Sequence, residues 1–127
     1  MLKLKTSTFY IIGGIAAVNE EIELELKKYG NVERIGGDNR YETSVLIAEH
    51  FFNNSNSAVL AYAKNFPDGL CAGSLAYHIN APIILTAVCS EKKADEYASK
   101  YNIRSGIVIG GDTLVSNETA NIIFTDK

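Results

Sequence analysis

Five short apolar runs, each followed by a stretch with helical spacing, constrain the fold of this 127-residue chain. The runs are rich in Val, Ile and Leu and mostly do not alternate with polar residues, which is typical of strands buried on both faces. They lie at residues 9–14, 32–37, 57–63, 81–86 and 105–111. The helical stretches lie at residues 19–30, 39–51, 68–80, 90–102 and 116–124. This alternation predicts an α/β fold with a mostly parallel five-stranded sheet and helices on both faces.

Several helix ends carry recognisable signals. Asn39 stands three residues before Glu42, which is the spacing of a capping box. Asn19 precedes two glutamates, whose charge suits the positive end of a helix dipole. Gly30 is placed to end the first helix as a left-handed glycine cap.

One internal repeat divides the chain. The segment 10–22 matches 107–120 at an offset of 97 residues, which aligns Gly13 with Gly110. A period of that length indicates a domain-sized repeat and not a solenoid. We therefore interpret residues 9–30 as the tail of one unit and residues 31–124 as the main unit. Because no linker-like segment separates them, residues 1–127 are predicted to form a single domain.

Composition limits the possible partners. The chain is 46% hydrophobic and 21% charged with a net charge of −3, so any anion binding must come from a local site. This balance predicts no nucleic-acid binding, and no apolar run is long enough to insert into a bilayer. The first residues lack the features of a signal peptide, so we expect either a cytoplasmic protein or a mature fragment. Cys71 and Cys89 are predicted to be small buried hydrophobic residues.

Three of the predicted strands end in an apolar residue and two glycines. These pairs are Gly13–Gly14, Gly36–Gly37 and Gly110–Gly111, and the second is followed by Asp38-Asn39-Arg40. Ligands of parallel α/β sheets bind beyond the carboxyl ends of the strands, where glycine lets backbone N–H groups approach an anion. The alternative is that each pair only permits a tight turn into the next helix. The three turns are expected at one edge of the sheet, and the sequence leaves both interpretations open.

Catalytic and nucleotide-binding signatures are missing from the sequence. No Gly-Gly pair has dinucleotide-binding spacing, and neither a P-loop nor a Gly-x-Ser-x-Gly elbow occurs. His50 and His78 lie in helical stretches and are predicted to be packed or surface residues. Asp38 and Asp112 could together hold a metal, but solvated turn carboxylates are favoured because no second acid lies nearby. We therefore predict no catalytic residue, no metal site and no cofactor.

The segment 63–73 places Pro67 and Asp68 at positions suited to a helix start. The helix that follows has a face of small residues, which allows another backbone to approach closely. These residues are Gly69, Ala72, Gly73, Ser74 and Ala76. The face is predicted to pack on the sheet, and a neighbouring subunit is the alternative.

Three segments together closely resemble the cell-wall-binding repeat type 2 family of Gram-positive bacteria. They read RIGGDNRYETSVLIAEHF, VLAYAKNFPDGLCAGSLAYHINAPIILT and IVIGGDTLVSNETA, and they cover nearly the whole chain. The family pattern differs mildly at Asn39, Ser44, Gly69 and Cys71. The resemblance implies a toprim-like or Rossmann-like parallel α/β fold and non-catalytic anchoring of a secreted surface protein to an anionic wall polymer, a carbohydrate. Members of this family usually have three such repeats in tandem, packed around a pseudo-threefold axis. The resemblance also implies a location at the cell wall.

The polymer-binding residues are expected at the second Gly-Gly turn and in the 63–73 loop. They are Arg34, Gly36, Gly37, Asp38, Asn39, Arg40, Tyr41, Asn65 and Asp68. Arg34 and Arg40 flank the turn, so two guanidinium groups and a helix start can face one anion. The competing hypothesis is that Arg40 braces the turn by pairing with Asp68 or Glu42.

Two further expectations follow from the resemblance. A chain with one repeat leaves bare the flanks that tandem repeats cover, so we expect a homotrimer or packing with sister repeats. The alternative function, a metal-dependent phosphoryl-transfer domain of toprim type, requires a clustered acidic triad.

Overall fold

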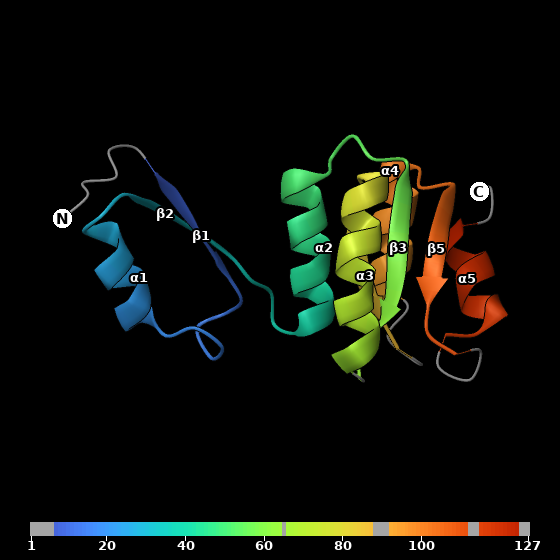
Figure 1. The fold of residues 1–127 in the computed structure, drawn as a ribbon, viewed down its shortest axis with the longest axis horizontal. Coiled ribbons are helices and arrows are strands. Elements are labelled where there is room, and N and C mark those ends of the chain that lie inside the picture. Colours follow the sequence, from blue (N-terminus) through green and yellow to red (C-terminus); the bar gives the residue numbers. More distant parts are fainter. Residues whose placement is uncertain (1–6, 65, 88–91, 112–114, 125–127) are drawn as a thin grey trace.

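All ten expected elements are present, and strand and helix alternate along the chain (Figure 1). The computed structural model describes residues 7–64, 66–87, 92–111 and 115–124, and for Phe66 and Asp68 only the backbone. The strands are β1 (Thr8–Ile12), β2 (Asn31–Ile35), β3 (Ser57–Tyr62), β4 (Ile83–Thr86) and β5 (Ser105–Ile109). The helices are α1 (Glu20–Lys27), α2 (Arg40–Phe51), α3 (Phe66–Ile79), α4 (Lys92–Tyr101) and α5 (Asn117–Phe124). No helix in these described ranges is long and apolar enough to cross a bilayer.

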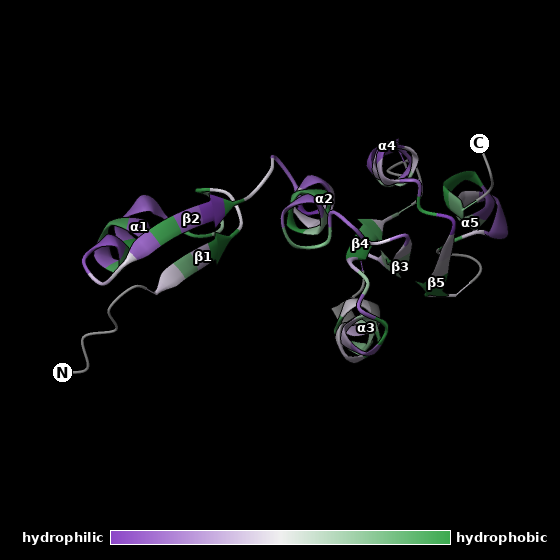
Figure 2. Ribbon diagram, turned by 90° about the horizontal axis from the view of Figure 1, so that it is seen from above, coloured by the Kyte–Doolittle hydropathy of each residue, from purple (hydrophilic) through white to green (hydrophobic). Residues whose placement is uncertain are grey.

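The strands form two parallel sheets, so the prediction of one five-stranded sheet is wrong. One sheet has the order β1-β2 and the other has the order β4-β3-β5. Helix α2 lies between the two sheets (Figure 2). The Ser44 hydroxyl oxygen on α2 accepts a hydrogen bond of 3.0 Å from the Leu85 N–H on β4. Because α2 covers this edge of β4, β2 cannot pair there and remains with β1.

The three-stranded sheet holds the hydrophobic core. Helix α3 covers one face, and α4 and α5 cover the other (Figure 2), as expected for helices on both faces. Residues Ala58 to Ala61 of β3 are each at most 1% exposed. The absence of polar alternation in β3 therefore reflects burial on both faces, as predicted, whereas β1 and β5 are largely exposed and the prediction is wrong for them.

The predicted N-terminal caps are confirmed, whereas the predicted glycine cap is wrong. Asn19 Oδ1 accepts from the Ile22 N–H at 3.2 Å, and Asn39 Oδ1 accepts from the Glu42 N–H at 3.0 Å. Gly30 does not adopt a positive φ. A Cβ there would instead collide with the Ser7 carbonyl oxygen, so the close approach of β1 is what favours glycine.

The small-residue face of α3 is divided between the core and solvent. Ala72 and Ala76 pack against β3, in agreement with the prediction, but no atom lies within 4 Å of a Cβ built at Gly69 or Gly73. Cys71 is exposed, so its predicted burial is wrong. It lies one residue before the buried Ala72 and therefore on a different side of the helix. Cys89 lies outside the described residues.

The internal repeat is also a structural repeat. Adding the offset of 97 residues to the bounds of β1 and α1 gives the bounds of β5 and α5. Gly13 and Gly110 have φ values of 124° and 143°. An equivalent backbone hydrogen bond follows both: the N–H of Val18 donates to the Gly14 carbonyl oxygen at 3.0 Å, and the N–H of Val115 donates to the Gly111 carbonyl oxygen at 3.1 Å. We call these segments the N-terminal copy (residues 8–27) and the C-terminal copy (residues 105–124).

Candidate functional site

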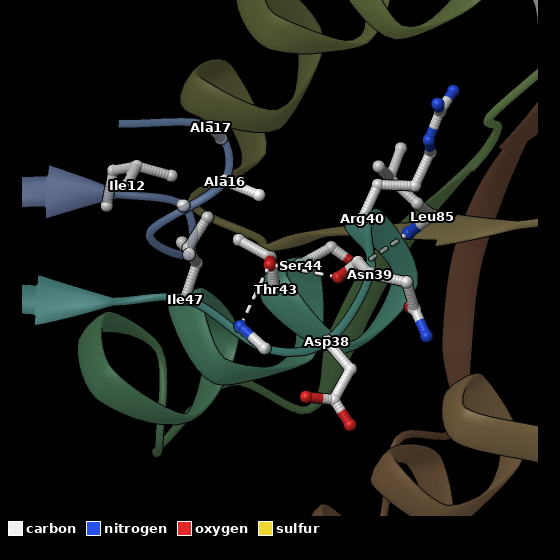
Figure 3. A pocket seen from close by; sticks show the side chains of 13 residues that line it. Ile12, Ala16, Ala17, Asp38, Asn39, Arg40, Thr43, Ser44, Ile47 and Leu85 are labelled. Atoms are coloured by element: carbon white, nitrogen blue, oxygen red, sulfur yellow. Dashed lines mark hydrogen bonds between the residues drawn. The ribbon is translucent and has the colours of Figure 1, made fainter. Parts of the chain in front are cut away.

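A cleft of about 470 Å³ lies where the turns after β1 and β2 meet the start of α2 (Figure 3). Its polar rim comes from the loop that enters α2, and its apolar wall comes mainly from the turn after β1 and from α2. The lining residues are Ile12, Gly13, Gly14, Ala16, Ala17, Gly37, Asp38, Asn39, Arg40, Thr43, Ser44, Ile47 and Leu85. We call this hollow the inter-sheet cleft.

Two of the three Gly-Gly pairs meet beside this cleft. A Cβ at Gly36 would collide with the backbone of Gly13, and a Cβ at Gly14 would lie 3.5 Å from the Gly37 carbonyl oxygen. The parallel pairing of β1 with β2 brings these two turns together. Gly110 follows β5 in the other sheet, so the expectation that all three pairs share one sheet edge is wrong.

The backbone N–H groups after β2 are paired within the chain. The Gly37 N–H donates to Thr43 Oγ1 at 3.1 Å, and the Asp38 N–H donates to Glu42 Oε2 at 2.9 Å. The Asp38 N–H and the nearby Lys93 ammonium lower the pKa of Glu42. The Glu42 carboxylate therefore already takes the position that an anion would occupy at the start of α2. Polymer contact by these N–H groups stays a prediction, and it requires Glu42 to move.

Arg34 braces the turn after β1. Its Nη1 donates to the carbonyl oxygens of Gly13 and Val18 at 2.9 Å each, and its Nε donates to Glu23 at 2.9 Å. The side chain is 16% exposed, and its Nη2 is buried. The guanidinium therefore connects β2 to the N-terminal copy, and it lies outside the lining of the inter-sheet cleft.

Arg40 lies at the rim of the inter-sheet cleft and is exposed. Its Nη1 donates to the Ala63 carbonyl oxygen at 2.9 Å, at the end of β3. Glu42, one of its two expected partners, is bound to the Asp38 N–H and lies 3.4 Å from Lys93. Arg40 thus braces a backbone carbonyl with one nitrogen and keeps the rest of its guanidinium at the surface.

The other expected residues divide among three locations. Asp38 and Asn39 line the inter-sheet cleft with Gly37, whereas Gly36 borders a hollow of about 370 Å³ beside Arg34. Tyr41 packs against buried side chains beneath the end of β3. Asn65 and the side chain of Asp68 lie outside the described part of the chain.

Sequence reasoning missed the apolar wall of the inter-sheet cleft. Ile12, Ala16 and Ala17 come from the N-terminal copy, and Ile47 and Leu85 come from α2 and β4. The Gly-Gly pair after β1 was a usable signal, because it marks a second turn of the kind that borders the cleft. Ile47 and Leu85 carry no such signal, since only the packing of α2 against β4 brings them together.

A second hollow, the α2–α3 groove, has a volume of about 460 Å³. Gly69, Gly73, Ala76 and Tyr77 supply its α3 side. Tyr77 is 90% exposed. Gly69 and Gly73, the two residues of the small-residue face that do not pack on the sheet, therefore lie at this open, apolar surface.

The described residues contain no group of three potential metal ligands. Asp38 is exposed in its turn, as predicted for a solvated carboxylate. Asp112 lies outside the described ranges, so its predicted role is untested.

Comparisons with known proteins agree with the resemblance seen in the sequence. The sequence model of a family described as Cell wall binding domain 2 matches residues 34–120. N-acetylmuramoyl-L-alanine amidase LytC of Bacillus subtilis is 34% identical over 96 residues, which cover 73% of this chain and 19% of the amidase. The amidase enhancer of the same bacterium is 31% identical over 121 residues, covering 95% of this chain and 16% of that protein. Cwp6 from Clostridium difficile has 28% sequence identity and a TM-score of 0.82, over 92% of this chain and 20% of Cwp6.

Proposed function

This chain belongs to the Cell wall binding domain 2 family and is a cell-wall-binding module, and we propose that it anchors a surface protein to an anionic wall polymer. The chain spans about a fifth of the length of the relatives that it matches. The amidase activity in one relative's name therefore belongs to that whole protein and is not assigned to this chain. We propose that the present module binds without catalysis, as part of a secreted protein at the cell surface.

The observation that carries the proposal is the composition of the inter-sheet cleft. Ile12, Ala17 and Ile47 offer an apolar wall against which the C–H face of a sugar ring can pack. Asp38 and Asn39 at the rim can hydrogen-bond to hydroxyl groups, and the exposed guanidinium of Arg40 can pair with a phosphate or carboxylate. One cation at an open cleft supports weak binding at each site.

Weak single sites favour a multivalent assembly, and a homotrimer is our proposal. The α2–α3 groove and the exposed Tyr77 and Leu70 beside it are apolar surface that a second subunit can bury. Three copies of the inter-sheet cleft on one polymer chain would then add avidity. We also propose that the three-stranded sheet has a toprim-like arrangement. Packing against sister repeats is the alternative to the homotrimer.

Binding to purified Gram-positive walls tests the function. Sedimentation with walls should capture the protein, and walls stripped of their anionic polymer should capture much less. Capture should also fall as salt rises, because exposed charges are screened. Equal capture by both wall preparations would contradict the anionic ligand. Light scattering gives the assembly, and a mass near 13.8 kDa would contradict the trimer.

Substitution of Arg40 distinguishes a role in ligand binding from a structural role in the turn. We expect Arg40→Ala to weaken capture about fivefold while the fold is retained, and Arg40→Lys to recover part of it because the charge returns. Lys92→Ala is the matched control, since Lys92 is a highly exposed cation outside the cleft lining. If folded Arg40→Ala binds like the wild type and only its free energy of unfolding falls, Arg40 is structural.

A further inference from the structure

The two structural copies use opposite edges of their strands. Gly13 donates its N–H to the Ile35 carbonyl oxygen at 2.8 Å, so the backbone groups of Gly13 and Ile11 face β2. The N–H and C=O groups of successive strand residues point to alternate edges. The equivalent residues of the C-terminal copy are Val108 and Gly110.

On β5 these equivalent groups face an open edge. The N–H of Val59 donates to Pro82 at 2.8 Å, so Val59 faces β4 and its neighbour Leu60 faces β5. Leu60 lies opposite Val108. In a parallel ladder the backbone groups of Leu60 bond to the residues on either side of Val108, so the N–H and C=O groups of Ile107 and Ile109 face β3. Those of Val108 face the other edge. Among the described strands, none lies on the other side of β5. The edge that binds β2 in the N-terminal copy is therefore unoccupied in the C-terminal copy.

We propose that the open edge of β5 binds strand β2 of a second copy of this chain, in the register that β2 adopts with β1. The pairing of β1 with β2 supplies the template, because β5 and α5 repeat β1 and α1 in their bounds and in the hydrogen bond that lies between strand and helix. In this arrangement Ile107 of one copy takes the place of Tyr10 opposite Glu33 of the other. The inference rests on the strand edge, but exchange would also remove Ile12, Ala16 and Ala17 of the N-terminal copy from the wall of the inter-sheet cleft.

The turn of the C-terminal copy also provides acceptors for Arg34. In the N-terminal copy, Arg34 binds the carbonyl oxygens of Gly13 and Val18, and the equivalent carbonyls belong to Gly110 and Val115. The ion pair with Glu23 has no equivalent, because Ala120 stands at that position. The intramolecular partner therefore binds β2 better, and exchange requires a high protein concentration.

Displacement of the N-terminal copy would expose Ile11 and separate Tyr10 from the rings of His50 and Phe51 on α2, but it would uncover little else. Helix α1 buries none of its residues, and Tyr10 and Ile12 of β1 are 45% and 44% exposed. The C-terminal copy is already ordered by its own core, since α5 buries Thr119 and Ile123. The C-terminal copy therefore presents a preorganised strand edge, whereas the N-terminal copy is held by β2 and by the contact of Tyr10 with α2.

Disulfide trapping tests the register. In a full-length background with Cys71→Ser and Cys89→Ser, one protein carries Ile107→Cys and a second carries Glu33→Cys. Adjacent strand positions meet the distance requirement for a disulfide, so mixing at high concentration should give the mixed dimer about fivefold above an out-of-register pair. That control replaces Glu33→Cys by Asn31→Cys, which lies on the same face of β2 two residues earlier. Equal yields, or no mixed dimer at the highest concentration, would overturn the proposal.

A locked variant tests displacement. Tyr10→Cys with Glu33→Cys in one chain should form an internal disulfide, because these residues are register partners. The lock consumes the thiol introduced at position 33, so association is measured by light scattering, and the oxidised protein should show a lower mass than the reduced protein at the same high concentration. In the trapping experiment, Glu23→Ala should raise the yield of mixed dimer by removing the advantage of the N-terminal copy. A locked protein that still associates in light scattering through β5 would contradict exchange.

Discussion

The N-terminal and C-terminal copies have the same local structure but different surroundings. Both consist of a five-residue strand, a glycine with positive φ and an eight-residue helix. The N-terminal copy pairs with β2 and contacts α2 through the Tyr10 ring, and its helix has no buried residue. The C-terminal copy lies in the three-stranded sheet, where α5 packs into the core. A repeated sequence thus repeats the conformation, whereas the neighbouring elements determine how much of it is buried.

Individual substitutions between the copies record this difference. Phe9 of the N-terminal copy corresponds to Gly106, and Lys27 corresponds to Phe124. In the C-terminal copy the aromatic ring comes from the helix, and a Cβ at Gly106 would collide with that ring and with the Ala58 carbonyl. In the N-terminal copy the aromatic residue is on the strand, and the Phe9 ring lies beside Gly30. The two copies therefore carry their aromatic residue on different elements.

The largest expected effect comes from adding a side chain at Gly106, the position where β1 carries Phe9. Gly106→Ala should lower the free energy of unfolding by about 3 kcal/mol, because the backbone of β3 or the ring of Phe124 must move. Urea denaturation measures the change. Gly69→Ala is the control, since the space above Gly69 is open and alanine favours a helix. Equal stability of the Gly106 and Gly69 variants would contradict the tight packing of the C-terminal copy.

Removal of Arg34 should loosen only the N-terminal copy. Arg34→Ala deletes three charge-assisted hydrogen bonds, and we expect a loss of about 2 kcal/mol confined to β1, α1 and β2. Amide hydrogen exchange should accelerate there and stay unchanged in β3. Arg104→Ala, which removes an exposed arginine, should leave both regions as they are. Faster exchange throughout the molecule would show that the two sheets unfold together.

The two glycines with positive φ offer a matched pair. Gly13→Ala and Gly110→Ala should each cost about 1 kcal/mol locally, because alanine is strained at φ values of 124° and 143°. We expect the first to appear only in hydrogen exchange of the N-terminal copy. The second should lower the urea midpoint of the whole domain, since β5 belongs to the core sheet. The same urea midpoint for both variants would argue against this distinction.

The smallest effect is the pH response of the N-terminal copy. Hydrogen bonds from Lys27 and then Arg34 lower the pKa of Glu23 below 4.5. A lowered folded-state pKa gives stability that is present above pH 4.5 and is lost as the pH falls through the folded value. Glu23→Gln should therefore remove part of the acid sensitivity of β1 and α1, and solvent screening keeps this change small. Hydrogen exchange of the wild type and of Glu23→Gln, compared as the pH is lowered from about 6, provides the measurement.

Much of the local structure could be predicted from the sequence, but the sheet pairing could not. The caps at Asn19 and Asn39 depend on groups three residues away, and both were predicted. The partners of Arg34 lie 11, 16 and 21 residues away, and two of them are backbone carbonyls that carry no residue-specific signal. The polar rim of the inter-sheet cleft was found because it follows a Gly-Gly motif. The apolar wall was missed because it depends on which turns lie side by side.

The sequence by itself determined the ten elements, their order, the repeated turn and the family. These features depend on propensity, on glycine conformation and on hydrogen bonds within a few residues. The tertiary structure decided which strand edges pair, and therefore the division into two sheets, the role of Arg34 and the open edge of β5. The physical reason is that strand edges offer the same N–H and C=O groups whatever their side chains. Two strands at equivalent positions of the repeat can thus bind different neighbours, and the packing of α2 against β4 determines which neighbour each one meets.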